Sequence, residues 1–318
     1  MDKQPLLSVC IPTYNRSTFL QEALRNLLDN QKTCEFCVEI LISDNCSTDE
    51  TGSVVETYIS KGLKCRYVHN EENIGPDANF VQCFSLAKGK YIWLIGDDDY
   101  LEPGALQIVC ESLENYEYGL VHIKLSNNEV LRTEYNKVSN FLSDINIMIT
   151  FMSANIINRT VVSSIKGQDY FGTFLVQVPY YIGAALAYTR NLILEANVLS
   201  TGHNSAANGG YNFFTVFMVN YFSIWREFIK KGYLSPKDYE YIKKETFERF
   251  HLNYIYRHLI GQPNQALDMS GCIKTTLRYF GMNLYLYTNL LRKCGNYYWM
   301  LLRHKVHMVR MKTMYKIK

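Results

Sequence analysis

The stretch "YIWLIGDDDYLEPG", residues 91–104, joins an apolar run to three consecutive carboxylates, Asp97, Asp98 and Asp99. Residues 91–96 have the length and composition of a buried strand, and Pro103 is typical of the start of a following helix. Like charges about 4 Å apart near a protein surface repel by roughly 4 kcal/mol per pair. Three adjacent aspartates are therefore stable only when they are solvated, partly protonated or bound to a cation.

The chain around this stretch alternates between strand and helix patterns from residue 6 to residue 124. Short apolar runs predict strands, and apolar residues at helical spacing predict the helices that separate them. The predicted strands are 6–11, 38–44, 65–70, 91–96 and 118–124, and the predicted helices are 16–31, 47–62, 75–89 and 102–116. Repeated strand–helix units of this length predict an α/β fold with a parallel sheet and right-handed crossovers.

The rest of the chain follows a less regular pattern. Residues 153–162 predict a strand that leads into a helix, and residues 167–187 predict an apolar helical segment interrupted by glycines. Residues 201–212 are rich in Gly and Asn, which is typical of a mobile binding loop. We expect a domain over 1–215, made of halves 6–125 and 126–215, and a helical, basic region over 216–318.

Polar residues follow three of the predicted strands, where ligands of open parallel sheets bind. They are the segment "PTYNR" (12–16), the pair Asp44-Asn45 and the three aspartates. This number of hard oxygen ligands favours Mg²⁺ or Mn²⁺ over a solvated turn. The sequence has no G-x-G-x-x-G after its first strand and no P-loop, so neither a dinucleotide oxidoreductase nor a P-loop NTPase is indicated. It favours an enzyme that holds a nucleoside diphosphate through a divalent metal.

Charge is distributed unevenly along the chain. The whole sequence carries a formal net charge of +3, but ten basic and no acidic residues follow Asp268, so the part before them carries −7. In this basic tail Trp299, Leu302 and Val306 recur at helical spacing. A basic amphipathic helix is typical of binding to an anionic membrane surface. A helix packed on the domain is the alternative for 272–295, and the acidic first part disfavours nucleic acid as a partner.

Signals for export or membrane insertion are absent from this sequence. No stretch approaches the length of an apolar membrane span, and the N-terminal residues lack the apolar core of a secretory signal. Its nine cysteines are scattered, and the single C-x-x-C at Cys34 and Cys37 has no second pair, which favours reduced thiols. We expect a cytoplasmic protein that is peripheral on the inner face of the plasma membrane.

Three stretches carry a specific similarity to a known family. They are "VCIPTYNR" (9–16), "ILISDNCSTDET" (40–51) and "NEENIGPDANFVQCFSLAKGKYIWLIGDDDYLEPGAL" (70–106). Together they resemble the nucleotide-sugar half of family 2 inverting glycosyltransferases, and the third is especially similar to the bacterial O-antigen branch that includes abequosyltransferase-like enzymes. The resemblance covers residues 6–125. It implies a GT-A fold (Rossmann-like, with a mostly parallel sheet flanked by helices), a nucleoside-diphosphate sugar donor, and Mn²⁺ or Mg²⁺ as cofactor.

The resemblance also implies which residues contact the donor. Those that match the family's nucleotide-sugar positions are Pro12, Thr13, Tyr14, Asn15, Arg16, Asp44, Asn73, Gly75, Asn79 and Asp97. Tyr14 would stack on the base and Arg16 would meet a phosphate. Asp44 would accept a hydrogen bond from the base or ribose; capping the next helix is its alternative role. For Asn79, a position on the helix surface is an equal alternative.

The metal ligands follow from the same alignment. The family motif reads D-x-D-D, and here its first position is Gly96. Counting back from Pro103 makes Asp98 the direct metal ligand, with Asp99 supporting or sharing the ion and Asp97 lying toward the ribose. His203, in the 201–212 loop, would complete the metal shell or touch the diphosphate, the alternative being a solvated loop histidine.

An inverting transferase also needs a base that takes the proton of the acceptor hydroxyl. The family supplies an Asp or Glu at the start of a helix downstream of the metal motif. Asp169, in "KGQDYFGTFL", matches this description, and Glu195 is the alternative. A helix-capping role for Asp169 stays open.

The expected function is therefore metal-dependent, inverting transfer of a sugar to a saccharide acceptor. The acceptor would be a lipid-linked oligosaccharide in O-antigen or capsule synthesis, which gives the basic tail a reason to meet a membrane. One alternative is a sugar nucleotidyltransferase, which would need a Gly-rich basic loop after the first strand. The other is a non-catalytic, membrane-associated binding protein of the same fold.

Overall fold

The computed structural model describes residues 4–201, 211–261, 267–281, 283 and 287–300. The chain divides into two compact units. The first consists of Met1–Ser205 with Ser223–Tyr241, and the second of Ala206–Phe222 with Ile242–Lys318. The first unit contains the sheet and every strand-end residue discussed below.

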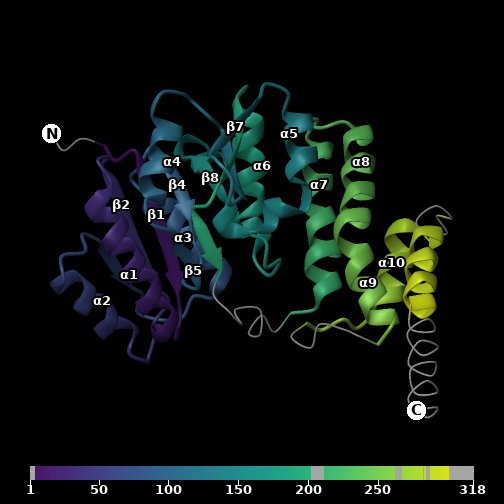
Figure 1. The fold of residues 1–318 in the computed structure, drawn as a ribbon, viewed down its shortest axis with the longest axis horizontal. Coiled ribbons are helices and arrows are strands. Elements are labelled where there is room, and N and C mark those ends of the chain that lie inside the picture. The colour runs from purple at the N-terminus through teal and green to yellow at the C-terminus, as the bar shows by residue number, and fades with distance from the viewer. Residues whose placement is uncertain (1–3, 202–210, 262–266, 282, 284–286, 301–318) are drawn as a thin grey trace, which may run out of the picture. The chain divides into compact units, whose positions relative to one another are not determined.

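An eight-stranded sheet forms the centre of the first unit (Figure 1). In spatial order its strands are β3 (Arg66–His69), β2 (Val38–Asp44), β1 (Leu7–Thr13), β4 (Tyr91–Leu94), β8 (Asn155–Asn158), β6 (Leu120–Leu125), β9 (Asn191–Ala196) and β7 (Leu131–Tyr135). The first four are parallel, as are β6 and β9, whereas β8 and β7 run antiparallel to their neighbours. The predicted α/β fold with a mostly parallel sheet is confirmed. Strand β7 and the antiparallel direction of β8 were not predicted.

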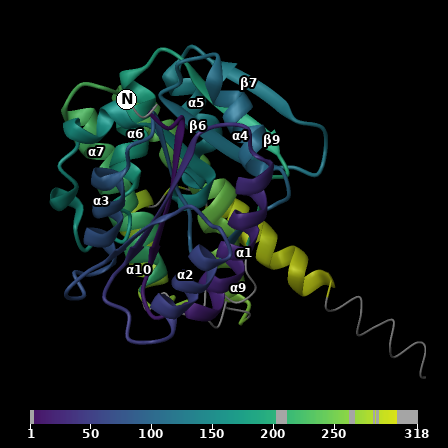
Figure 2. The same cartoon turned by 90° about the vertical axis from the view of Figure 1, so that its left-hand side faces the viewer.

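Helices cover both faces of this sheet (Figure 2). They are α1 (Ser17–Thr33), α2 (Thr51–Ser60), α3 (Pro76–Leu86), α4 (Ala105–Glu114), α5 (Val138–Ile145) and α6 (Val178–Ala187). Helices α7 (Tyr221–Lys230) and α8 (Pro236–Thr246) come later in the sequence. Helices α1, α2 and α4 lie on one face, and α3 and α6 lie on the other. Because side chains alternate along a strand, Leu7, Val9 and Ile11 of β1 pack in the first layer, while Cys10 lies against Cys83 of α3.

Strand β1 runs two residues further than the sequence pattern predicts. Pro12 and Thr13 pair in register with Ser43 and Asp44 of β2, so the polar loop begins at Tyr14. The carbonyl of Cys10 accepts a hydrogen bond from the N–H of Ile95, which follows β4. The carbonyl of Thr13 accepts one from the N–H of Asn45, which follows β2. Pro12 therefore faces the β4 side, where the ladder between β1 and β4 has already ended. A proline is tolerated there because no partner strand needs its missing N–H.

The predicted helical segment over 167–187, interrupted by glycines, forms an α-helix only from Val178 to Ala187. A 3₁₀ turn at Gly167–Tyr170 and a loop precede α6. Gly172 and Phe174 have φ angles of +81° and +57°, which a right-handed helix does not allow. Pro179 lies in the first turn of α6, where its missing N–H has no cost. The predicted strand within 153–162 is confirmed as β8, and a 3₁₀ helix, Arg159–Ser164, follows it.

A small two-stranded ladder lies directly after the three aspartates. Strand β5 (Asp99–Leu101) pairs antiparallel with β10 (Leu199–Thr201), so Asp99 belongs to a strand and not to a loop. This pairing was not predicted, because three residues are too few for a recognisable periodic pattern.

The second unit is helical, as the sequence predicts for the C-terminal region. It contains π-helical turns at Thr215–Asn220 and Phe247–His251, helices α9 (Leu252–Leu259) and α10 (Cys272–Phe280), and a helix over 287–300. Aromatic rings fill its interior: the ring centroids of Phe213 and Tyr254 lie 4.3 Å apart, and those of Phe213 and Phe250 lie 5.4 Å apart. Within the described ranges of the chain, no helix is long and apolar enough to cross a membrane.

Candidate functional site

Arg16 joins the carboxyl ends of β1 and β4. Its Nε lies 2.8 Å from Asp97 Oδ1, and its Nη2 donates a hydrogen bond to Asp98 Oδ2 at 2.5 Å. Thr13 Oγ1 also donates to Asp97 Oδ2, at 2.8 Å. One guanidinium thus bridges two consecutive carboxylates and offsets the repulsion that the sequence alone would predict between them.

Burial changes the acidity of two of these carboxyl groups. It raises the pKa of Asp97 to about 6, although the guanidinium of Arg16 and the hydroxyl of Thr13 act in the opposite direction. Burial likewise raises the pKa of Asp99 to about 6, against the hydrogen bond that Ser153 Oγ donates to Asp99 Oδ2 at 2.5 Å. Desolvation therefore outweighs the favourable partners at both positions.

Gly96 leaves a small space that faces two carboxylate oxygens. A Cβ atom built at Gly96 would lie 2.8 Å from Asp98 Oδ1 and 3.1 Å from Asp99 Oδ2. The backbone N–H of Gly96 donates to Ser153 Oγ at 2.9 Å, so the same serine fixes both the glycine and Asp99. The two oxygens therefore converge on the position that any side chain at residue 96 would occupy.

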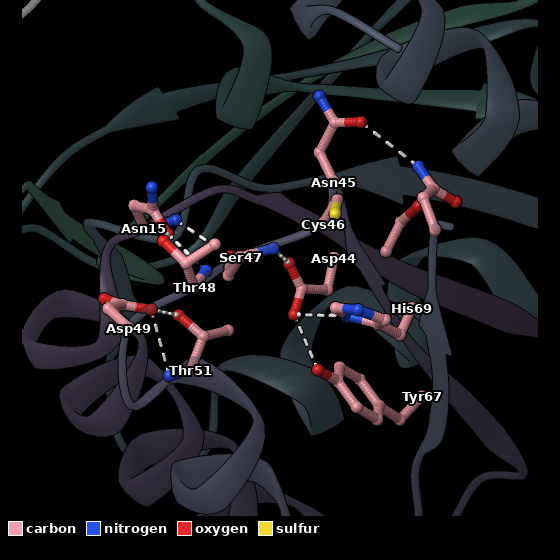
Figure 3. A network of polar contacts seen from close by, with 12 residues as sticks. Asn15, Asp44, Asn45, Cys46, Ser47, Thr48, Asp49, Thr51, Tyr67 and His69 are labelled. Carbon is pink, nitrogen blue, oxygen red and sulfur yellow. Dashed lines mark hydrogen bonds and ion pairs between the residues drawn. The ribbon is translucent and has the colours of Figure 1, made fainter. Parts of the chain in front are cut away.

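Asp44, at the end of β2, is fully buried and held on both of its oxygens (Figure 3). The backbone N–H of Ser47 donates to Oδ1 at 2.9 Å, and the hydroxyl of Tyr67 donates to Oδ2 at 2.6 Å. His69 Nδ1 lies 3.2 Å from the same Oδ2. Burial and the adjacent Asp44 raise the pKa of Tyr67, so this phenol stays a donor. The arrangement fixes the turn that follows β2.

Asn15 ties the loop after β1 to the loop after β2 (Figure 3). Its backbone N–H donates to Ser47 Oγ at 2.8 Å, and its side-chain oxygen accepts from the N–H of Thr48 at 2.7 Å. Its φ of +52° lies in the left-handed region that asparagine tolerates. Next to it, Tyr14 is 42% exposed and so is not a core residue.

Three further asparagines extend this network to α3. Asn45 Nδ2 donates to Asn73 Oδ1 at 2.7 Å, and the N–H of Gly75 donates to the same oxygen at 2.9 Å. Asn79 is buried, and both ends of its amide bond Ser43: Oδ1 accepts from the hydroxyl at 2.6 Å and Nδ2 donates to the carbonyl at 3.0 Å. Asn79 thus lies inside the unit and not on the helix surface, which was the alternative considered for it.

Asp169 is exposed and lies in the 3₁₀ turn Gly167–Tyr170. The loop that follows this turn lies beside the first turn of α3, because the N–H of Gly172 donates to Asp77 Oδ2 at 2.7 Å. The alternative base, Glu195, lies in β9 and pairs with Lys124 of β6 at 3.0 Å. His203 lies outside the described residues.

A family comparison agrees with this arrangement. Residues 8–193, more than half of the chain, match the model of glycosyl transferase family 2. The chain belongs to glycosyl transferase family 2. The matched range contains Arg16, Asp44 and the three aspartates Asp97–Asp99, and it extends past the 3₁₀ turn that carries Asp169.

Curated relatives match about a third of this family 2 chain. Abequosyltransferase RfbV of Salmonella typhimurium is 41% identical over 111 residues, which is 35% of this chain and 33% of that protein. The GalNAc(5)-diNAcBac-PP-undecaprenol beta-1,3-glucosyltransferase of Campylobacter jejuni is 32% identical over 120 residues, 37% of each chain. The alignment therefore spans only about a third of the length of these relatives.

Solved structures extend the likeness to the whole fold. TarS 1–349 of S. aureus has a TM-score of 0.57 at 16% identity, covering 92% of this chain and 90% of that one. The mannosyltransferase PcManGT from Pyrobaculum calidifontis, solved with GDP-Man and Mn²⁺, has a TM-score of 0.50 at 14% identity, covering 92% and 86%. The family 2 chain thus has the GT-A fold that its sequence implies.

The oxygens at this family 2 site suit a divalent ion. Among the residues that the structure describes, no group of three or more His, Cys, Asp or Glu side chains is placed to hold a metal. Sites for Mg²⁺ or Mn²⁺ beside nucleotides usually need only one or two carboxylates, because substrate phosphates and water complete the shell. The convergence of Asp98 Oδ1 and Asp99 Oδ2 beside Gly96 meets that requirement.

Ser153, Tyr67 and His69 are the residues of this site that sequence reasoning missed. Ser153 precedes β8 and is 54 residues from Asp99, so no local pattern links the two. Tyr67 and His69 lie in β3, in register with Ile42 and Asp44, and alternate residues of a predicted strand next to β2 could have indicated them.

Proposed function

We propose that this chain transfers a sugar from a nucleoside-diphosphate sugar to a hydroxyl of a saccharide acceptor, with inversion at the anomeric carbon. The observation that carries the proposal is the bridge from Arg16 to Asp97 and Asp98 at the carboxyl ends of β1 and β4 in a family 2 chain. Cationic and anionic groups that converge beyond parallel strands suit a ligand with a diphosphate and a ribose.

Donor binding is assigned to the strand-end residues. The exposed ring of Tyr14 is available to stack on the base, and the fixed carboxylate of Asp44 holds the β2 turn beside it. Asp97 faces the ribose in this proposal, and Arg16 holds the side chains of Asp97 and Asp98 in place through its contacts with both. Asn15, Asn73 and Asn79 hold the surrounding loops in place.

Asp98 and Asp99 would hold the cofactor, Mn²⁺ or Mg²⁺, through the oxygens that face Gly96. When bound, such an ion offsets the negative charge that develops on the leaving diphosphate. Ser153 orients Asp99 for this role through the hydrogen bond to its Oδ2. Asp169, exposed and beside the first turn of α3, is the group proposed to take the acceptor proton.

The proposed acceptor is a lipid-linked oligosaccharide of O-antigen or capsule type. Its support is similarity to proteins named as an abequosyltransferase and as a glucosyltransferase of an undecaprenol-linked chain. The helix over 287–300 exposes apolar side chains beside Arg292, namely Leu291, Tyr298, Trp299 and Met300. Such a surface suits an anionic leaflet, so we place the protein peripherally on the inner face of the plasma membrane.

Donor hydrolysis tests the catalytic part of the proposal. Purified chain is incubated with UDP-, CDP- and dTDP-sugars, with Mn²⁺ or with EDTA, and free nucleoside diphosphate is measured. We expect hydrolysis of one donor class that requires Mn²⁺ and falls at least 100-fold in Asp98→Ala, since a directly bound charge is lost. Asp29→Asn is the matched control, because Asp29 is a solvent-exposed carboxylate on α1. Equal rates in Asp98→Ala and wild type would reject the metal site.

Vesicle co-sedimentation tests the membrane part separately. Vesicles of phosphatidylglycerol should retain the chain, and vesicles of phosphatidylcholine should not. The double variant Tyr298→Ala/Trp299→Ala should lose most of this retention while its donor hydrolysis is unchanged. Retention equal to wild type would exclude the helix over 287–300 as the membrane contact.

A further inference from the structure

A loop at the edge of the candidate site exposes two phenyl rings. Phe171 and Phe174 are 45% and 46% exposed, although burial of a phenylalanine side chain is favourable. Phe174 has a φ of +57°, a left-handed conformation in which a bulky residue is strained. Exposed apolar area and backbone strain in one short loop are typical of residues that contact a ligand.

The loop is fixed by hydrogen bonds on the side of the protein interior. Tyr170 is buried and donates its hydroxyl to Glu227 Oε2 at 2.8 Å. Thr173 Oγ1 donates to the carbonyl of Tyr170 at 2.7 Å and accepts from the N–H of Leu175 at 3.1 Å. These contacts order the backbone of the loop before any ligand binds. A ligand that contacts the two rings would therefore lose little binding free energy to ordering of the loop.

Asp77 connects the loop to the first turn of α3, near the carboxyl ends of the parallel strands. Its Oδ2 accepts from the N–H of Gly172 at 2.7 Å, and the backbone N–H of Phe174 bonds the same carboxylate. Asp77 lies in the first turn of α3, a few residues after Asn73, which bonds Asn45 beyond the end of β2. A continuous chain of contacts thus runs from the end of β2 to the two phenyl rings.

We propose that Phe171 and Phe174 form the platform on which the acceptor saccharide binds, an assignment that rests on the proposed function. A phenyl ring has no polar atom, so it selects the C–H face of a sugar ring and leaves the hydroxyls to polar neighbours. Asp169, two residues before Phe171, is an exposed carboxylate within the same segment. The carboxylates of Asp77 and Asp169 would repel an anionic leaflet, which favours a saccharide over a membrane as the occupant.

An array of immobilised bacterial oligosaccharides, neutral and acidic, tests this platform without a known acceptor. The full chain is applied with Mn²⁺ and whichever of UDP, CDP or dTDP it binds. Phe171→Ala and Phe174→Ala should each weaken retention by roughly fivefold to tenfold, with a larger loss in the double variant. Phe171→Tyr should retain binding, because the ring is kept. Nucleotide affinity should be unchanged in all of them.

Two matched variants separate loss of the ring from loss of the fold. Phe174→Gly removes the ring and relieves the left-handed strain, so it should keep or raise the melting temperature and still lose saccharide binding. Tyr116→Ala removes an aromatic side chain that is 47% exposed and precedes β6, at the opposite edge of the sheet, and should bind as wild type does.

The outcomes distinguish this assignment from the proposed function itself. A wild-type chain that binds none of the three nucleotides contradicts the proposed function. A chain that binds a nucleotide but no oligosaccharide, or whose double variant is retained as wild type is, overturns the platform alone. The Phe171→Ala/Phe174→Ala variant could instead lose its retention on phosphatidylglycerol vesicles while its binding to the array is intact. That result would also overturn the platform and identify the rings as a membrane contact.

Discussion

Arg16 and Asp98 come from the ends of two neighbouring strands, 82 residues apart in sequence, and their side chains meet at 2.5 Å. The same guanidinium lies 2.8 Å from Asp97. Both contacts are mostly shielded, since the Arg16 side chain is 22% exposed and that of Asp98 is 16% exposed. The cation therefore makes three adjacent aspartates compatible with a folded strand end.

Replacement of Arg16 should cost both stability and activity. Arg16→Ala leaves two adjacent carboxylates without their cation, and breaking a buried ion pair in this way costs about 3 kcal/mol. Arg16→Lys should recover only part of this loss, because an ammonium cannot contact both carboxylates through a planar fork. Urea denaturation at pH 7 measures the effect. Arg25→Ala, at a surface pair on α1, is the control and should change stability by a few tenths of a kcal/mol.

Gly96→Ala should damage the metal site while leaving the fold intact. The new methyl group would lie 2.8 Å from Asp98 Oδ1 and 3.1 Å from Asp99 Oδ2, so both carboxylates must move apart. We expect Mn²⁺-dependent hydrolysis to fall by about 100-fold, which is the effect of displacing a side chain that binds the metal directly. Gly52→Ala is the matched control, because its methyl group would make an ordinary contact at 3.4 Å. Full activity in Gly96→Ala would show that these oxygens do not bind the ion together.

His122 should make stability depend on pH in the acidic range. Burial lowers its pKa to about 4, and its Nδ1 lies 2.9 Å from Asn155 Oδ1 within the sheet. A depressed histidine pKa contributes stability that is present above the unfolded pKa of about 6.5 and is lost as pH falls toward 4, by roughly 3 kcal/mol. The raised pKa values of Asp97 and Asp99 act in the opposite sense, since their contribution is lost as pH rises toward 6.

A comparison of wild type with His122→Gln isolates the contribution of His122 to the pH dependence of stability. The carboxyl contributions are common to both chains, so the difference in unfolding free energy between them should shrink as pH falls from 7 to 4. Chemical denaturation at several pH values measures it. A difference that stays constant over this range would mean that His122 is not buried as a neutral ring.

The donor half of the fold was predictable because local patterns and tertiary structure agree there. Strands β1, β2 and β4 are short apolar runs, and the helices between the strands have apolar residues at helical spacing. Gly96, Asp97 and Asp98 lie beyond the end of a buried strand, so topology alone indicates where they meet. Local pattern and tertiary structure no longer agree at Asp99, because it pairs with Thr201 of β10, about a hundred residues away in sequence.

The rest could not be predicted because its determinants are long-range. Strand β7 is an exposed edge strand without apolar alternation, and β8 owes its antiparallel direction to pairing between β4 and β6. The site's dependence on Ser153 comes from the same packing. The sequence predicts a helix at Phe174. Instead, the backbone N–H of Phe174 bonds the carboxylate of Asp77, and Phe174 has a left-handed backbone conformation.

Calorimetric titration of Asp98→Ala with nucleoside diphosphate tests the central claim most directly. UDP, CDP and dTDP are each titrated with Mn²⁺ into wild type, Asp98→Ala and the control Asp29→Asn. The account predicts that one of them binds wild type and Asp29→Asn alike, and binds Asp98→Ala at least tenfold more weakly. Equal affinity for Asp98→Ala and wild type would contradict it.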